Sequence, residues 1–464
     1  MQYDWNHPFF MPACLLRQKG PAVKRIHSEN TDIVATKSPR QSKPLKRRIV
    51  AIIAAVVIVA LVATGGLWYA VWGGRYILAD LRRPKAIAAT DSAAQSAQTF
   101  AYESAVKILN GDGNTNYSPV SLQMALLIAS KGAKGNTLLQ LQQALDSGNL
   151  TDEDLNSLYL SIAGKRDGES RIDAANSLWA LRDLSINTDY SDTVQRIFGA
   201  QVKRVNTFDS NTNSKMSAWV SDQTHGVLKP EIDISANTGL AILNTLYANG
   251  RWDSPFDTEL TEKAEFQSLQ GTSNTVDFMH KTITIMQDSS DDSDTYTKGD
   301  GWQRVDLTFD NGGCMKILLP DDNTHFKALL TDATALRNTF QAEPNAQDGA
   351  EINVSLPKFT IDNTLDSDAM IDAVRNMGVT DAFDASKADF SGMSDSQMFI
   401  GSIVQGTRVE VSEVGAEAAA YTQIGMMLAI LPTETIEFNA DHPFLFELDS
   451  PDGLPSFIGS VVDL

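Results

Sequence analysis

The side chains that could carry catalysis or hold a metal ion are scattered along this chain. No two histidines have the spacing of a metal-binding pair, and no Gly-x-Ser-x-Gly turn presents a nucleophilic serine. The six histidines are His7, His27, His225, His280, His325 and His442. We therefore expect no catalytic residue, no metal site and no cofactor.

One segment, Glu413 to Leu431, is patterned both as a strand and as a loop. From Ala416 onward the even positions are small or apolar, whereas the odd positions include Glu417 and Tyr421. This period of two is typical of a half-buried β-strand. Gly415 makes the segment pliable, and Pro432 ends it where a strand would otherwise continue. The segment is therefore expected to adopt two conformations.

This pattern resembles the hinge and reactive loop of the serpins, and further segments in the same order extend the similarity over nearly the whole chain after residue 96. The hinge-like residues are Glu413, Val414, Gly415, Ala416, Glu417, Ala418, Ala419 and Ala420. The other similar segments are SPVS (118–121), KGAKGNT (131–137), LNTLYANGRW (243–252), LPKF (356–359), GVTDAFD (378–384), ADFSGMS (388–394), FNADHPFLF (438–446) and the terminal FIGSVVDL.

The resemblance implies an α+β serpin fold. Such a fold has a large central, mostly antiparallel sheet, further sheets, about nine helices and an exposed reactive loop. The residue pattern agrees, because helical periodicity follows Asp91, Pro119, Thr137 and Thr151, while strand-like runs such as 314–320, 351–359 and 407–412 come later. Thr137 is predicted to cap a helix, and Thr151 with Asp154 is predicted to form a capping box.

A serpin serves as bait, so the resemblance implies that the chemistry belongs to an attacking serine protease. Family spacing from Gly415 places the reactive bond at Ala429–Ile430, preceded by the specificity residues Met426, Met427 and Leu428. A small apolar residue before the bond favours an elastase-like target. A chymotrypsin-like target is the second choice, if cleavage falls after Leu428. After cleavage the freed loop is expected to enter the central sheet and trap the protease as a suicide substrate.

The resemblance also implies a region that controls opening of the sheet. Its residues here are Asn114, Ser118, Ser121, Asn244 and Gln405. Gln405 departs from the family's usual histidine, so the latch is expected to lack pH sensitivity. Ala416 replaces the usual Thr or Ser of the family, but it is small enough to enter the sheet. Tyr421 is bulky, but it stands at an odd position, on the side of the strand that is expected to face solvent.

The N-terminal region reads as a membrane anchor. Residues 49–72 are 24 residues without charge, preceded by a basic tail with a net charge of +7 and ending among aromatic residues. We predict a disordered cytoplasmic tail (1–48), a single transmembrane signal anchor through the lipid bilayer (49–72), a linker (73–95) and an extracellular serpin domain (96–464). The alternative is a cleaved secretory signal.

Charge and cysteine content restrict the partners. Residues 86–464 hold 24 Lys and Arg against 54 Asp and Glu, a net charge of −30, which argues against nucleic acid and heparin. The two cysteines, Cys14 and Cys314, are predicted to lie on opposite sides of the membrane and cannot pair. A monomeric bacterial surface protein fits these features.

Two other functions stay open from the sequence. One is a non-inhibitory serpin, a surface binding module whose loop is cut without insertion. The other is a membrane-anchored sensor that signals through the basic tail. No proline interrupts the hinge, and its even positions Ala416, Ala418 and Ala420 carry no charge, which favours inhibition.

Overall fold

The computed structural model describes residues 85–164, 170–286, 294–415 and 432–464. Contacts divide the chain into Met1–Tyr69 and Ala70–Leu464, and the described residues all belong to the second unit. The predicted tail and the predicted anchor at 49–72 lie outside the described residues. Among the residues that are described, no helix combines the length and the apolar composition needed to cross a bilayer.

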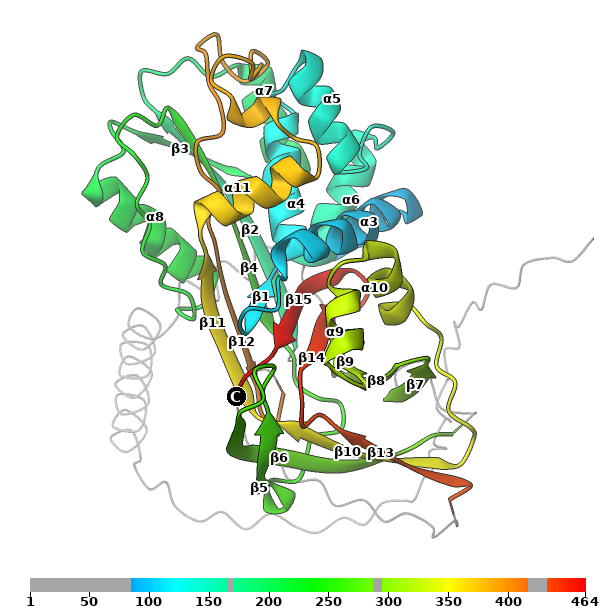
Figure 1. Ribbon diagram of the computed structural model, residues 1–464. Coiled ribbons are helices and arrows are strands. Elements are labelled where there is room, and N and C mark those ends of the chain that lie inside the picture. Colours follow the sequence, from blue (N-terminus) through cyan, green and yellow to red (C-terminus); the bar gives the residue numbers. More distant parts are fainter. Residues whose placement is uncertain (1–84, 165–169, 287–293, 416–431) are drawn as a thin grey trace, which may run out of the picture. The chain divides into compact units, whose positions relative to one another are not determined.

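The described ranges contain nine α-helices and two short 3-10 helices (Figure 1). They are α3 (Asp91–Ile108), α4 (Pro119–Ser130), α5 (Gly135–Ala144), α6 (Asp152–Ala163), α7 (Thr188–Phe198), α8 (Ser210–Gln223), η1 (Thr258–Leu260), α9 (Asn323–Leu329), α10 (Ala333–Phe340), α11 (Ser367–Asn376) and η2 (Asp381–Phe383).

The strands of the described residues form four hydrogen-bonded sheets. The largest, which is antiparallel throughout, has the order β1 (Thr115–Tyr117), β15 (Pro455–Val461), β14 (Phe444–Asp449), β9 (Cys314–Pro320), β8 (Trp302–Thr308) and β7 (Thr295–Gly299). The second has the order β13 (Glu434–Asn439), β10 (Ala350–Pro357), β6 (Ser273–Thr284) and β5 (Glu262–Gln267). The other two are β3 (Gln201–Val205), β2 (Arg171–Leu181) and β4 (Leu240–Asn249), and the pair β11 (Phe359–Leu365) and β12 (Gln405–Val411).

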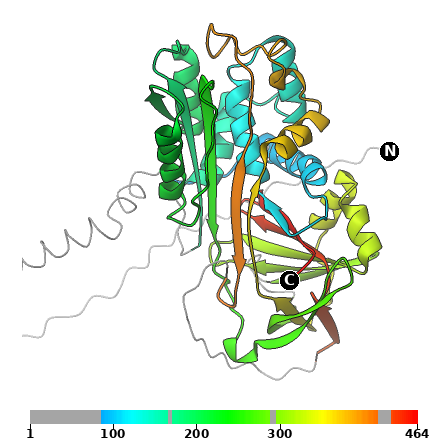
Figure 2. The same ribbon diagram turned by 60° about the vertical axis from the view of Figure 1, so that its left-hand side comes forward.

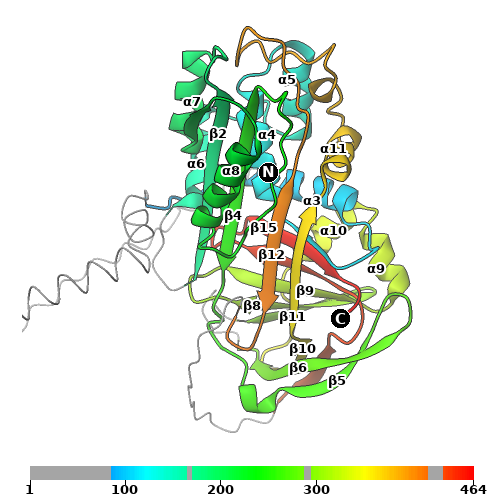
Figure 3. The ribbon, with the colours of Figure 1, turned by 90° about the vertical axis from the view of Figure 1, so that its left-hand side faces the viewer.

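The two smaller sheets form one layer, in which β2, β4, β12 and β11 stand next to one another (Figures 2 and 3). Helix α8 covers one face of this layer and α4 lies on the other. The aromatic and apolar side chains of α8, including Trp219 and Met216, pack on Trp179 of β2. The larger core lies between α4, the two larger sheets and the remaining helices.

Local signals explain where several of these elements begin. Ser118 accepts a hydrogen bond from the backbone N–H of Ser121, and Pro119 occupies the first turn of α4, where its missing N–H costs nothing. Thr151 and Asp154 form the predicted capping box at the start of α6. Strand β12 alternates as predicted, with Val409 and Val411 buried.

The prediction that Thr137 caps a helix is wrong. Helix α5 begins two residues earlier, at Gly135, and Lys134 occupies the cap position without a side-chain hydrogen bond. The Thr137 hydroxyl instead accepts a hydrogen bond from the backbone N–H of Asp389 at 3.0 Å. A tertiary contact therefore uses the side chain that local sequence assigned to the helix end.

The predicted α+β class, the number of helices and the large antiparallel sheet are confirmed for the described residues. The predicted central sheet, however, is not one continuous ladder. In the described ranges β4 pairs only with β2, and β12 pairs only with β11.

Candidate functional site

The structure describes the start of the predicted hinge but not its continuation. Glu413 and Gly415 are described, whereas the remaining hinge residues, the specificity residues and the reactive bond lie outside the described residues. These are Ala416, Glu417, Ala418, Ala419, Ala420, Met426, Met427, Leu428, Ala429 and Ile430. Their predicted roles stay predictions.

A tight turn, Ser412–Gly415, ends the described chain before the loop. The N–H groups of Ser412 and Gly415 each donate to the other residue's carbonyl oxygen, at 3.0 and 3.2 Å, and the Ser412 hydroxyl also donates to the Gly415 carbonyl at 2.9 Å. Gly415 has a φ of +140°, and a Cβ at this position would overlap the carbonyl oxygen of Gly250. Only glycine fits this turn without strain.

The segment that follows β4 holds the turn in place. Trp252 donates from its indole N–H to the Ser412 carbonyl at 2.9 Å and from its backbone N–H to the Val414 carbonyl at 3.1 Å. The backbone N–H of Phe256 donates to the Glu413 carbonyl at 2.9 Å. The Trp252 ring, which is buried, stacks on Phe309 with the ring centroids 5.0 Å apart. The hinge therefore starts from a rigid anchor.

Glu413 is the charged residue of the turn, and only 8% of it is exposed. Its carboxylate accepts hydrogen bonds from the Thr261 hydroxyl at 2.9 Å and from Lys358 Nζ at 3.0 Å. Burial alone would raise the pKa of Glu413, but the hydrogen bonds from Lys358, from its own backbone and from Thr261, with the charge of Lys358, outweigh it and lower that pKa. The ionised carboxylate ties the hinge to the junction of β10 and β11.

The ends of β4 and β12 meet at this anchor. Arg251, just after β4, forms an isolated bridge with Gly415, just after β12. The two strands therefore run toward the same end of their layer, where Figure 3 shows them next to each other. Because neither strand pairs with the other in the described ranges, each keeps a backbone edge that the other does not use.

Four of the five predicted sheet-opening residues lie at the start of α4 and on the strands beside it. The Ser118 N–H donates to Gln405 Oε1 at 2.8 Å, and Gln405 Nε2 donates to the Ser118 carbonyl at 3.0 Å. The Ser121 hydroxyl donates to Asn244 Oδ1. One helix end therefore holds both β12, through Gln405, and β4, through Asn244.

Asn114 is placed elsewhere. Its Oδ1 accepts hydrogen bonds from the N–H groups of Val462 and Asp463, at 2.7 and 3.0 Å, and its Nδ2 donates to the Asp463 carbonyl. It fastens the C-terminal end of β15 and makes none of the hydrogen bonds that join Ser118, Ser121, Asn244 and Gln405 in the described chain.

Several residues of the site were not predicted from the sequence. Lys358 lies in the segment LPKF, and Trp252 lies in the segment LNTLYANGRW. The sequence features that could have indicated them are a lysine and a large aromatic residue, each next to the end of a strand. Asn176 receives a hydrogen bond from Asn244 Nδ2 at 2.7 Å. Asn116 is fully buried and accepts a hydrogen bond from the Thr407 hydroxyl at 2.7 Å.

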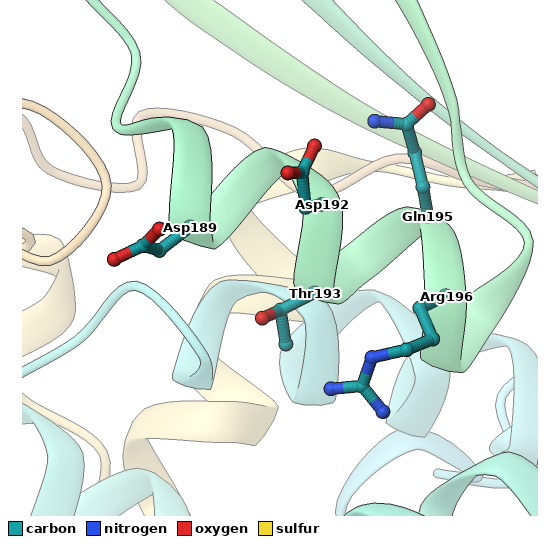
Figure 4. Close-up of a pocket in the computed structure, with 5 residues that line it drawn as sticks. All are labelled: Asp189, Asp192, Thr193, Gln195 and Arg196. Atoms are coloured by element: carbon teal, nitrogen blue, oxygen red, sulfur yellow. The ribbon is translucent and has the colours of Figure 1, made fainter.

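The described residues bring together no group of three or more His, Cys, Asp or Glu side chains that could hold a metal ion. A hollow on the outer surface of α7 is lined by Asp189, Asp192, Thr193, Gln195 and Arg196 (Figure 4). Arg196 is already engaged, because it donates to Asp152 at 2.7 Å. The hollow is open, and all of its lining residues belong to α7. None of them takes part in the hydrogen bonds of the hinge anchor described above.

Comparison with known proteins agrees with this architecture. A family model described as serpin, serine protease inhibitor, matches residues 94–464. Serpin B6 of Pongo abelii is 30% identical over 369 residues, which are 77% of this chain and 95% of that protein. The leukocyte elastase inhibitor of Homo sapiens is 31% identical over 354 residues, covering 73% and 89%.

Among solved structures, the native state of the thermophilic serpin tengpin matches with a TM-score of 0.71 and 24% identity, over 83% of this chain and 98% of that one. The chain belongs to the serpin family. Its relatives are protease inhibitors rather than enzymes.

Proposed function

We propose that this protein inhibits extracellular elastase-like serine proteases by covalent trapping, with insertion of its cleaved loop between β4 and β12. The observation that carries the proposal is the hinge turn Ser412–Gly415. It is fastened where the two strands end, and the two strands share no ladder with each other in the described ranges. A chain that turns back from Gly415 would run antiparallel to both strands and could pair with both edges.

In this mechanism the protease serine attacks the carbonyl carbon of Ala429. The peptide bond to Ile430 breaks, the Ile430 nitrogen leaves as a free amine, and Ala429 becomes the acyl group of an ester to the protease. The hinge residues then enter the layer with Ala416, Ala418 and Ala420 facing inward. An inserted strand of about fourteen residues is roughly 45 Å long, so the tethered protease is carried far from its starting point. Distortion of its active site prevents hydrolysis of the ester.

The preference for elastase-like enzymes rests on Ala429 and on the apolar residues Met426, Met427 and Leu428. The names of several relatives support it, since leukocyte elastase inhibitors of horse, mouse and human are 30–31% identical to this chain. Chymotrypsin-like enzymes remain the second candidate, with Leu428 before the cleaved bond.

We also propose that the protein works as a monomer at the outer face of a cell membrane, possessing a single anchor at 49–72. The net charge of −30 after residue 85 supports the expectation that neither nucleic acid nor heparin is a partner. Protease protection of tagged N-terminal residues in intact cells tests the orientation. Digestion of the tag from outside would contradict it.

The proposal is tested by incubating the protein with elastase and separating the products on a denaturing gel. A complex that resists SDS, with a mass equal to the sum of both proteins, is the expected result. Quantitative cleavage without such a complex would instead identify a binding module. Mass spectrometry of the released peptide checks that Ile430 is its first residue.

A pair of adjacent substitutions tests insertion itself. Ala418→Arg places a charge on the inward face of the inserting strand, where burial costs several kcal/mol, and should convert the inhibitor into a substrate. Ala419→Arg places the same charge one residue later on the solvent face and should leave inhibition intact. Equal inhibition by both variants would contradict the insertion account.

A further inference from the structure

His442 stands between β13 and β14, and both nitrogens of its ring lie against an oxygen atom. Nε2 is 2.8 Å from the carbonyl oxygen of Pro320, the last residue of β9, and Nδ1 is 2.7 Å from Asp441 Oδ1. A carbonyl oxygen and a carboxylate oxygen only accept hydrogen bonds, so both ring nitrogens have to donate. This geometry requires the protonated imidazolium form of His442.

The charged groups around the ring favour the same form. Among the described residues they are Asp441 and Asp321, which follows β9, and both are acidic. Burial alone would lower the pKa of His442, but the hydrogen bonds to Asp441 and Pro320, with the charges of Asp441 and Asp321, outweigh it and raise that pKa. The side chain of His442 is 27% exposed, so its proton can exchange with solvent.

A neutral ring cannot keep both contacts. If Nε2 retains the proton, the lone pair of Nδ1 faces the Asp441 carboxylate. If Nδ1 retains it, the lone pair of Nε2 faces the Pro320 carbonyl oxygen. One of the two contacts must therefore open when His442 loses its proton to solvent.

The connection that carries His442 joins two sheets. Strands β9 and β14 belong to the six-stranded sheet, whereas β13, β10 and β5 belong to the four-stranded sheet. The N–H of Gln267, at the end of β5, donates to the Asp441 carbonyl at 2.7 Å, and the N–H of Ala440 donates to the Ser355 carbonyl of β10 at 2.9 Å. These two hydrogen bonds join backbone groups, which do not titrate. Of these three contacts, only the one from His442 to Pro320 responds to pH near neutrality.

Strand β13 depends on fastenings at its two ends. It lies at the edge of the four-stranded sheet, where in the described ranges its ladder partner is β10 (Figure 1). The six pairs of this ladder are parallel, a pairing that is slightly less stable per residue than an antiparallel one. Thr433 fastens the start, because its N–H donates to the Gly349 carbonyl at 2.9 Å and its hydroxyl donates to the Asp348 carbonyl at 3.0 Å. His442 fastens the other end.

We propose that His442, with its contacts to Asp441 and Pro320, is a pH-sensitive clamp on β13 that holds the reactive bond in position for the protease. Ala429 precedes Glu434, the first residue of β13, by five residues, so loosening of β13 moves the point from which the bond is presented. His442 is thus a positioning residue that acts through β13. Its effect on inhibition rests on the proposed inhibitory function, whereas the clamp itself does not.

The raised pKa of His442 decides the direction of the pH dependence. The stabilisation from the clamp is fully present below the unfolded pKa of about 6.5 and is lost as the pH rises through the higher folded value. The clamp is therefore closed in mildly acidic solution and open in alkaline solution.

Titration of the histidine rings by NMR in the full chain measures the clamp directly. The His442 signal is identified by its absence from His442→Gln. Its pKa should lie above 6.5, and Asp441→Asn, which removes the carboxylate but keeps the ring, should lower it. If His442→Gln folds poorly, comparison of the parent with Asp441→Asn still identifies the ring, because the signal beside residue 441 is the one that shifts. A pKa at or below 6.5 in the parent protein would overturn the clamp.

Hydrogen exchange in residues 434–439 measures the response of β13. The protection factor, which corrects for the intrinsic pH dependence of exchange, should fall about tenfold in the parent between about pH 6 and about pH 9 and should stay constant in His442→Gln. His325→Gln is the matched control, because His325 Nδ1 also lies 3.0 Å from a carboxylate oxygen, that of Asp322, but near the start of α9. This control should fall as the parent does. Equal pH dependence in the parent and in His442→Gln would contradict the clamp.

The second-order rate constant of elastase inhibition tests the consequence for function. Elastase has a pH dependence of its own, so the rate constant of the parent is divided by that of His442→Gln at each pH. This ratio should fall about threefold as the pH rises over the same range, whereas the ratio of the parent to His325→Gln should stay constant.

The two proposals can fail separately. A constant ratio of the parent to His442→Gln, with the covalent complex still formed, would overturn the role of the clamp in inhibition and leave the proposed function standing. If the protection of β13 responds to pH as expected but the parent forms no covalent complex, the proposed function falls and the clamp on β13 stands.

Discussion

The ion pair between Lys358 and Glu413 should hold the hinge in its uncleaved position. Replacing Lys358 by Met keeps the length of the side chain but leaves the Glu413 carboxylate, which is 10% exposed, without a cation. Breaking a fully buried pair costs about 3–5 kcal/mol. Because Lys358 is 37% exposed, water reaches the pair, and we expect a loss of about 2 kcal/mol.

A double-mutant cycle measures this interaction. Lys358→Met, Glu413→Gln and the double variant are unfolded in urea in their uncleaved forms, with tryptophan fluorescence as the signal. For a domain of this size, 2 kcal/mol corresponds to a fall of about 3 °C in Tm. The coupling between the two residues should be about 1–2 kcal/mol. The pair Lys263 and Asp277, whose atoms are 2.9 Å apart with 69% and 48% exposure, is the matched control and should couple by less than about 0.5 kcal/mol.

The sign of the pH dependence provides a second readout. The folded-state pKa of Glu413 is lowered, so its contribution is present above the unfolded value of about 4.5 and is lost as the pH falls through the lower folded value. Lys358→Met should shift this loss to higher pH. The proposed role of the ion pair would be refuted if the effects of the two substitutions were additive and if Lys358→Met left the loss of stability at low pH unchanged.

Three further predictions concern other parts of the fold. Gly415→Val should destabilise the uncleaved protein by more than about 2 kcal/mol, because Gly415 has a φ of +140° and its surroundings leave no room for a Cβ. Gly113→Ala should be nearly neutral, because a Cβ at Gly113 would have no atom within 4 Å. Urea unfolding of the two variants compares these effects. Burial and then the charge of Asp449 raise the pKa of Glu447 to about 8. The stabilisation from Glu447 is therefore fully present below its unfolded pKa of about 4.5 and is lost as the pH rises through 8. Glu447→Gln should flatten the stability–pH curve between these two values. Gln405→Ala should cost about 1–3 kcal/mol in the same assay, because two backbone groups lose their partner, and a loss below 0.5 kcal/mol would show that the contact is dispensable.

Local chemistry in the sequence predicted much of the fold. The Thr151 capping box, Pro119 at the start of α4 and the alternation in β12 each depend on neighbours within a few residues, and each is confirmed. Thr137 shows the limit. Local sequence predicts this hydroxyl at a helix end, but a backbone N–H more than 250 residues away donates its hydrogen bond to it instead.

The site was less predictable for the same reason. Lys358 and Glu413 are 55 residues apart, and nothing in a single sequence pairs a lysine with one carboxylate out of 58. Asn114 and Ser118 stand close in sequence, yet Asn114 fastens the C-terminal strand while Ser118 holds β12. The family resemblance placed these residues in one region, and only the three-dimensional arrangement separates them.

The account depends most on energy stored in the uncleaved molecule, and comparing its melting temperature with that of the cleaved molecule tests this directly. If about ten to fourteen residues join the sheet at roughly 0.5–1.5 kcal/mol each, the gain is on the order of 10 kcal/mol, which corresponds to a rise in Tm of more than about 10 °C. Cleaved Ala418→Arg should show little of this rise. Identical melting temperatures for the intact and cleaved parent protein would contradict loop insertion.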